Sequence, residues 1–336
     1  MSLTKLSLAL TLLLAACAST SVPQPSASTA QASKPATPIK LTASFSEPVP
    51  QELPAWLPKE AGIFEKHGLD VELKFIASTA AIAALVAGEV VVGNTGGPSI
   101  LNAVAGGADL VVAAVPLALS PFQIYSPPSI TSMNDLKGKA VGVSRFGGQS
   151  DIEMRVALKA SGLDAKKDVR FVETGDAQAT TATLLQGVVQ AAAQNPASAP
   201  ALLKQGLHPI FDLGTSKQPF AEQVVVAKRD WVVQNRPVMQ RYIDATVEAM
   251  QRQKQDKALS VSVLKKYLKS DDDAAMAETY DIYMKLFPTL PVPKAEQFQV
   301  AKEIVADTNP KAASIDLDKL VDASFAADAE KRGLGR

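Results

Sequence analysis

Short apolar runs alternate with helix-length segments in two successive series along this 336-residue chain. Such alternation is typical of parallel sheets covered by helices, and two series of similar length predict two α/β lobes. The expected strands are 39–44, 71–75, 90–93 and 110–115 in the first series, then 140–144, 169–172, 191–194 and 209–213. The expected helices are 54–61, 80–87 and one starting near Pro98, then 150–161, 176–186 and 200–205.

After residue 226 the pattern changes to long amphipathic helices without a further series of strands. We expect helices from 230 or 237 to 254, and at 258–268, 273–287 and 294–306. Packing this tail on the first lobe requires two connecting segments, expected at 122–126 and 222–227, which can act as a hinge. The predicted fold class is therefore α/β, with two doubly wound lobes: lobe 1 from 38–126 and 226–336, including the helical extension, and lobe 2 from 127–225.

The N-terminus has the features of an export signal, with Lys5, an apolar run at 6–14 and small residues before Cys17. Leu14-Ala15-Ala16-Cys17 resembles the lipobox of bacterial lipoproteins, which implies a signal peptide at 1–16 and a lipid on Cys17. The alternative is an ordinary signal cut beside an accidental cysteine. Residues 17–37 have a composition that cannot bury enough apolar surface to fold, so we expect a flexible tether at a bacterial membrane, facing the periplasm or cell surface.

Composition narrows the possible functions. The chain has one cysteine, so acylated Cys17 would leave no thiol for a disulfide, a metal or nucleophilic chemistry. Thirty-four basic residues balance 34 acidic ones, which gives no indication of a nucleic-acid partner. An apolar fraction of 47% suffices for a sizeable core.

In open α/β sheets, ligands bind at loops that follow the carboxyl ends of strands. The sharpest such loop is 144–151, where Gly147 and Gly148 free the backbone, Ser150 is expected to cap the next helix and Arg145 to meet a carboxylate or sulfonate. An ordinary glycine turn with a solvated Arg145 is the alternative. The other candidate ligand contacts lie in the equivalent loops: Ser46, Glu47, Ser78, Thr79, Thr95, Gly175 and Asn195. For Ser78 and Thr79 a bare helix cap is equally compatible with the sequence.

Other notable side chains have structural interpretations. Trp56 is expected in the core, with the floor of a pocket as the alternative. Glu52 is expected in solvent, although both Glu47 and Glu52 could meet a ligand ammonium or hydroxyl. His67 and His208 each stand beside a glycine in an expected surface turn. Neither histidine has a cluster of ligands or a nucleophile near it in sequence, so we predict no metal, no cofactor and no catalytic site. The run at 271–273 is interpreted as a helix N-cap.

Ordered landmarks resemble the NitT/TauT group of ABC-transporter substrate-binding proteins, which have the type 2 periplasmic-binding fold. The landmarks are Trp56-Leu57-Pro58-Lys59-Glu60-Ala61-Gly62-Ile63-Phe64, His67-Gly68-Leu69-Asp70-Val71-Glu72-Leu73, Ala83-Ala84-Leu85-Val86-Ala87-Gly88, Asp135-Leu136-Lys137-Gly138-Lys139-Ala140-Val141-Gly142-Val143, Gly162-Leu163 and Leu184-Leu185-Gln186-Gly187. The resemblance implies a monomer whose lobes close over one small molecule and dock on a permease driven by a separate ATPase. By analogy, ligand contacts fall at Ser46, Ser78, Thr95, Gly147, Ser150, Gly175 and Asn195.

The sequence departs from the group at 174–180 and at 194–196, which bears on ligand identity. A sulfonate or carboxylate is the expected solute, and an amine or a neutral heterocycle stays open. Two other functions remain: a sensory or binding lipoprotein without a transporter, and a biosynthetic enzyme on the same fold.

Overall fold

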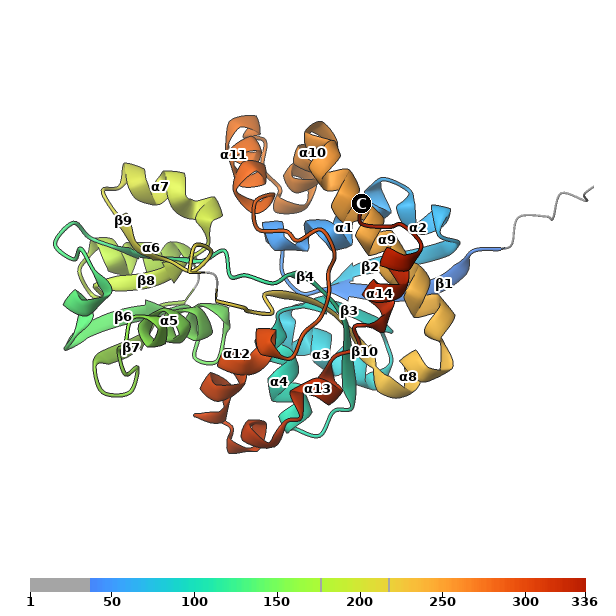
Figure 1. Ribbon diagram of the computed structural model, residues 1–336. Helices are drawn as coiled ribbons and strands as arrows, with labels where there is room; N and C mark the ends of the chain where they lie inside the picture. Colours follow the sequence, from blue (N-terminus) through green and yellow to red (C-terminus); the bar gives the residue numbers. More distant parts are fainter. Residues whose placement is uncertain (1–36, 176, 217) are drawn as a thin grey trace, which may run out of the picture. The chain divides into compact units, whose positions relative to one another are not determined.

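Two five-stranded sheets form the framework of this computed structural model, which describes residues 37–175, 177–216 and 218–336 (Figure 1). The strand order is β2-β1-β3-β10-β4 in the first sheet and β7-β6-β8-β5-β9 in the second. The strands are β1 (Ile39–Phe45), β2 (Leu69–Phe75), β3 (Val92–Thr95), β4 (Leu110–Leu117), β5 (Gln123–Ser126), β6 (Lys139–Val143), β7 (Val169–Glu173), β8 (Ala191–Gln194), β9 (His208–Asp212) and β10 (Gln223–Lys228). The eight predicted strands are confirmed, each within two residues at both ends.

The connecting segments differ from the prediction. Most of 122–126 is strand β5, which runs antiparallel to β8 and β9, and most of 222–227 is β10, which runs antiparallel to β3 and β4. Both segments are short apolar runs, and Val224, Val225 and Val226 are fully buried, so sheet pairing and burial account for their conformation. The chain passes between the sheets at 118–122 and 213–222. The division into two lobes stays a prediction.

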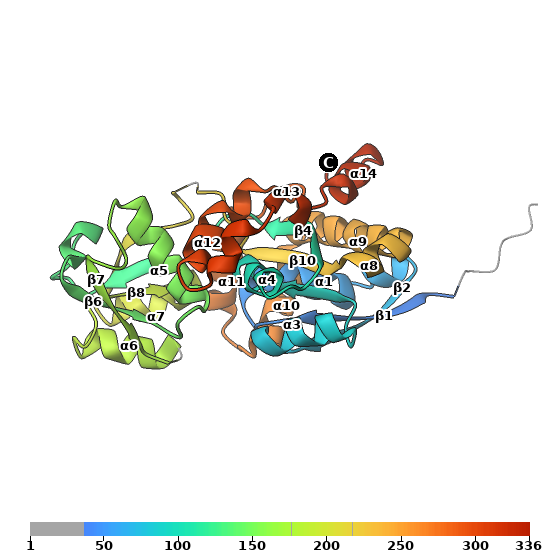
Figure 2. The same cartoon turned by 90° about the horizontal axis from the view of Figure 1, so that it is seen from below.

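Helices cover both sheets, as the alternation predicted (Figure 2). The elements of the first series are η1 (Pro50–Glu52), α1 (Leu53–Glu60), α2 (Ile63–Lys66), α3 (Ser78–Ala87) and α4 (Gly97–Ala105). The second series has η2 (Met133–Leu136), α5 (Gln149–Ala160), α6 (Ala177–Leu185), η3 (Pro196–Ser198) and α7 (Ala199–Lys204). Pro98 lies in the first turn of α4, where its missing N–H costs no helical hydrogen bond.

The C-terminal helices pack on the first sheet and its helices, as expected: α9 contacts α1 and β4, α12 contacts α4, and α14 contacts β4. Two of them also reach the second series, because α12 contacts α5 and α11 contacts η3. These elements are α8 (Arg229–Gln234), α9 (Arg236–Gln255), α10 (Lys257–Leu268), α11 (Asp273–Tyr283), α12 (Glu296–Ala306), η4 (Pro310–Ser314), α13 (Leu317–Leu320) and α14 (Ser324–Lys331). Asp272 caps α11 by accepting from the Ala275 N–H, so the helix-cap interpretation of the aspartate run is confirmed.

The core position of Trp56 is also confirmed. Its indole is fully buried and stacks on the Tyr267 ring at a centroid distance of 4.5 Å, with the edge of Phe45 at 5.6 Å. This aromatic cluster fixes α1 and α10 against the first sheet. The helices in the described part of the chain include none that is both long and apolar enough to cross a membrane.

The two histidines are less exposed than predicted. His67 follows α2 in a turn, but its Nε2 lies 2.9 Å from Glu248 Oε2 on α9, and its side chain is only 17% exposed. His208 is the first residue of β9, where it pairs with Ser126. Both histidines therefore serve packing between elements that are distant in sequence.

Candidate functional site

A cavity of about 370 Å³ is lined by strand-end residues of both sheets. The first sheet contributes the loop after β1, the end of β3 and the start of β10, and the second contributes the loop after β6 and the end of β8. Parallel pairing of β1 with β3, and of β6 with β8, brings these carboxyl ends to one edge of each sheet. The volume of the cavity is in the range of small-molecule sites.

Most of the predicted contact residues line this cavity: Ser46, Glu47, Thr95, Arg145, Gly147, Gly148, Ser150 and Asn195. Gly175 does not, and its N–H instead donates to Ser144 O at 3.2 Å. The side chains of Ser78 and Thr79 lie outside the described residues, as do Cys17, the predicted signal and the predicted tether up to residue 36. Whether the lining residues touch a ligand stays a prediction.

The glycine loop after β6 satisfies its own backbone donors. The Phe146 N–H donates to Glu173 Oε1 at 2.9 Å, and the Gly147 N–H donates to Asp151 Oδ2 at 2.8 Å. Gly147 has φ 73°, in the left-handed region that favours glycine. The loop is thus tied down by two carboxylates of this chain.

Ser150 does not cap α5, contrary to the prediction. Gly148 is the N-cap residue, and Ser150 lies inside the first turn. Its Oγ turns back to the strand end, where it accepts from the Ser144 N–H at 2.8 Å and lies 2.7 Å from Ser144 Oγ. The hydroxyl therefore closes the loop onto β6.

Positive charge is confined to the rim of the cavity. Among the described residues that line it, Arg145 is the only lysine or arginine, and its side chain is exposed. Phe146 beside it is 52% exposed, which is unusual for a large apolar side chain and places an aromatic surface at the mouth.

Carboxyl groups lie deeper in the cavity, and their burial was not predicted from the sequence. Glu52, expected in solvent, is fully buried: its Oε2 accepts from Gln223 Nε2 at 2.7 Å, and its Oε1 accepts from the Ser46 N–H at 3.4 Å. Its hydrogen-bond partner Gln223 lies 171 positions away, so a local sequence pattern gives no sign of this burial. Burial raises the pKa of the Glu52 carboxyl well above its usual value.

Two further buried carboxyls, those of Glu153 on α5 and Glu222 just before β10, lie close together. Gln149 Nε2 donates to both Glu153 Oε1 and Glu222 Oε2, each at 2.7 Å, and Gln51 Nε2 donates to Glu222 Oε1 at 3.1 Å. Burial raises the pKa of Glu153 to about 7 and that of Glu222 well above its usual value, and the Glu153 charge raises the latter further. Two such carboxyls in one buried site hold a proton between them near neutral pH.

Two more buried groups at the cavity have open hydrogen-bonding capacity. Within the described residues, Thr95 Oγ1 and Gln194 Nε2 have no hydrogen-bond partner, although their side chains are 1% and 3% exposed. Buried polar groups are normally paired, so these two are candidates for ligand contact. A local sequence pattern indicated polar groups here, because Gln194-Asn195 and Glu222-Gln223 place three amides and one carboxyl beside the ends of two strands.

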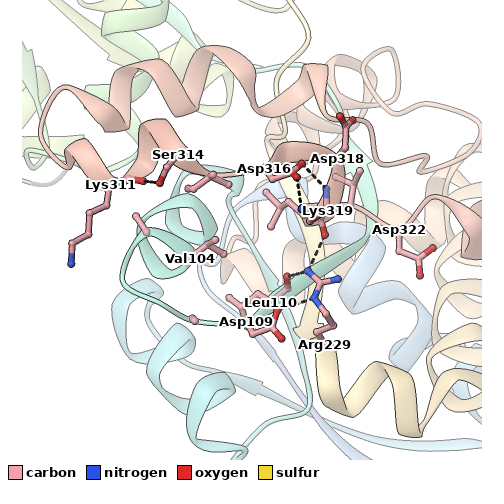
Figure 3. A pocket seen from close by; sticks show the side chains of 15 residues that line it. Val104, Asp109, Leu110, Arg229, Lys311, Ser314, Asp316, Asp318, Lys319 and Asp322 are labelled. Atoms are coloured by element: carbon pink, nitrogen blue, oxygen red, sulfur yellow. Dashed lines mark hydrogen bonds and ion pairs between the residues drawn. The ribbon is translucent and has the colours of Figure 1, made fainter.

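A larger cavity of about 800 Å³ lies elsewhere, between α4, the start of β4 and the η4–α13 region (Figure 3). Three of its four carboxylates form ion pairs within this chain: Asp109 pairs with Arg229, Asp316 with Lys319 and Asp322 with Arg236. Arg229 also donates to the Leu110 and Lys319 carbonyls (Figure 3). This arrangement is that of a surface clamp between chain segments, and the smaller cavity is the better candidate site.

The model of the family described as NMT1/THI5 like matches residues 50–257, which include most of the cavity lining. The chain belongs to the NMT1/THI5-like family. Among curated proteins none matches it.

Solved structures similar to this NMT1/THI5-like chain include periplasmic solute-binding proteins. The aliphatic sulphonate binding protein SsuA of Escherichia coli is 24% identical, with a TM-score of 0.70 over 84% of this chain and 92% of that one. The nitrate-binding protein NrtA of Synechocystis PCC 6803 is 16% identical, with a TM-score of 0.70 over 88% of this chain and 89% of that one. The alkanesulfonate-binding protein SsuA of Xanthomonas axonopodis pv. citri, bound to MOPS, is 20% identical, with a TM-score of 0.63 over 88% of this chain and 98% of that one. The NitT/TauT-type resemblance and the periplasmic-binding fold are thereby confirmed.

Proposed function

We propose that this protein is the extracytoplasmic solute-binding component of an ABC importer, which captures a small polar organic solute and delivers it to a membrane permease. The observation that carries the proposal is the cavity itself, because residues from the strand ends of both sheets line it. Buried Thr95 Oγ1 and Gln194 Nε2 add unsatisfied polar groups at its wall. The similar solved structures named above support the same role.

The proposed mechanism is closure of two lobes over the solute. The two crossings between the sheets, at 118–122 and 213–222, are the segments about which such a motion would turn. Closure requires contacts made only when both lobes meet the ligand, since a ligand with equal affinity for both states shifts no equilibrium. In this proposal the boundaries between the lobes lie at these crossings, a few residues from the boundaries at 126 and 225 that the sequence predicted.

We also propose that the mature chain is a monomeric lipoprotein anchored through Cys17, with 17–37 as its tether. The lipobox-like Leu14-Ala15-Ala16-Cys17 and the export features before it support this location in the periplasm or at the cell surface. A receptor held at the membrane is restricted to the neighbourhood of its permease, which raises the local concentration for docking.

Binding without chemistry fits the site better than catalysis does. The polar side chains that line the cavity are amides, hydroxyls, the carboxyls of Glu47, Glu52 and Glu222, and the Arg145 guanidinium at its rim. In the described residues no three His, Cys, Asp or Glu side chains form a metal-binding group. A sensory lipoprotein would use the same cavity, and deletion of the gene separates the two roles, since only the importer is required for uptake of radiolabelled solute.

A thermal-shift screen of the full-length protein tests the binding function. Solutes should include sulfonates, carboxylates, nitrate, pyrimidines and amines, and a ligand at about 100 times its Kd adds about 2.7 kcal/mol to the free energy of unfolding. Arg145→Ala should change the affinity of the solute that binds, whereas Arg170→Ala, on exposed β7, should not. A screen in which no solute raises Tm would reject the proposed function.

A further inference from the structure

The buried ionisable groups of the cavity are carboxyls, not the lysines or arginines that would neutralise an anion. Glu47, Glu52 and Glu222 line it, while Arg145 is the only lysine or arginine among its described lining residues and stands exposed at the rim. Glu52 and Glu222 are at most 2% exposed, so a ligand charge beside them acts on their ionisation with little screening by water: a cation favours the carboxylate and an anion favours the neutral carboxyl. An anion in the interior would face carboxyl groups without a buried counter-charge.

The usual alternative, an anion held by backbone donors at a helix N-terminus, is also weakened here. The N–H groups of Phe146 and Gly147 already donate to the carboxylates of Glu173 and Asp151. The Ser144 N–H donates to Ser150 Oγ. These three donors of the loop that leads into α5 are thus occupied by oxygens of the chain itself.

We infer that the solute is a small organic cation, an ammonium or amidinium that also carries a hydroxyl or carbonyl oxygen, with its charged end toward Glu222 and its oxygen toward Gln194. The inference rests on the proposed binding function and narrows its ligand class. Gln194 Nε2 is a buried donor without a partner among the described residues, so it requires an acceptor on the ligand. Each Glu222 oxygen accepts one amide hydrogen, from Gln51 or Gln149, and retains capacity for a second donor.

Cation binding in this site is linked to a proton. The Glu153 and Glu222 carboxyls share one proton near neutral pH, because burial raises the pKa of Glu153 to about 7. A cation beside Glu222 favours the ionised form of both carboxyls and expels that proton. Affinity for a cation therefore rises with pH between 6 and 8, by up to about tenfold per pH unit for one linked proton. The ionisable groups facing Glu222 are Glu47, Glu153 and Tyr283, with Glu52 and the rim Arg145 also at the cavity.

The test compares solutes of similar size that each carry a hydroxyl group and differ in charge. Tm of the full-length protein is measured with ethanolammonium against 2-hydroxyethanesulfonate, and with 4-hydroxybenzylammonium against 4-hydroxybenzenesulfonate, at pH 6 and pH 8. We expect the cation of a pair to raise Tm more than its anion, with a larger shift at pH 8. Calorimetry of the better cation in two buffers of different ionisation enthalpy should show proton release.

Two variants test whether Glu222 is the group that binds the cation and is linked to proton release. Glu222→Gln should weaken the cation at least tenfold and remove the proton release, whereas Glu89→Gln, at an exposed position outside the cavity, should change neither. If Glu222→Gln does not fold, the wild-type proton release still decides. A larger shift with the anions, or cation binding without proton release, overturns the inference and leaves the proposed function standing. No shift with any of the four solutes or with the wider screen rejects both.

Discussion

Tyr283 Oη lies 2.9 Å from Asn195 Oδ1, so the end of α11 contacts the loop that follows β8. The same hydroxyl lies 3.0 Å from Gln51 Oε1 on η1. One hydroxyl hydrogen thus serves two carbonyl oxygens, one from each sheet's loops. Burial raises the pKa of Tyr283 well above its usual value, which keeps it protonated and able to donate.

Tyr283→Phe should lower the free energy of unfolding by about 1–2 kcal/mol, because a buried hydrogen bond is lost and its acceptors are left without that donor. Urea unfolding measures this change. A double-mutant cycle with Asn195→Ala should give a coupling free energy of about 0.5–1.5 kcal/mol. Strict additivity of the two substitutions would show that the contact carries no energy.

Gly147→Ala should cost about 1 kcal/mol of stability, because φ 73° is unfavourable for a residue with a Cβ. Gly138→Ala is a matched control: its φ is 75°, and at both positions a Cβ meets no atom within 4 Å. Urea unfolding should show similar losses for both variants. Isothermal titration should show weaker solute binding only for Gly147→Ala, which lies in the cavity wall; equal affinities for the two variants would remove the loop from the site.

Glu153 makes stability dependent on pH. Its folded-state pKa of about 7 exceeds the ordinary 4.5, so the folded protein holds a proton that the unfolded chain releases at lower pH. The contribution of Glu153 to the free energy of unfolding is complete below pH 4.5 and falls by roughly 3 kcal/mol as pH rises toward 7. Glu153→Gln should flatten this decline in urea unfolding at pH 5, 6, 7 and 8. Glu89→Gln should leave it unchanged, and an equal slope in all three proteins would contradict the assignment.

Cys17→Ala should release the protein from membranes, since a thiol is required for acylation at this position. Fractionation of cells into membrane and soluble pools measures it, and Ser19→Ala, two residues later, is the control. Retention of Cys17→Ala in the membrane pool would argue against the lipid anchor.

The sequence predicted elements better than contacts. Strands and helices followed from apolar periodicity and glycine stops, which are local signals. The burial of Glu52 was not predictable, because it depends on Gln223 across 171 positions. Strands β5 and β10 were interpreted as connections since a short apolar run fits either role, and only pairing with distant strands distinguishes them.

The site was predicted by its location more than by its chemistry. The rule of strand-end loops placed Ser46, Thr95 and Asn195 at the cavity. It assigned a cap to Ser150, whose hydroxyl instead bonds the Ser144 N–H, because a loop's path decides which donor a side chain reaches. The carboxyls of Glu153 and Glu222 carry the electrostatics of the site, and their proximity arises only from the fold.

The position of β10 between β3 and β4 bears on the order of folding as the chain emerges. β4 pairs in its sheet with β10 alone, so β4 has no sheet partner until residue 228 has appeared, although β1, β2 and β3 can already pair with one another. All five strands of the second sheet lie between 123 and 212. That sheet can therefore assemble first and serve as a finished template while the earlier half of the chain is still incomplete.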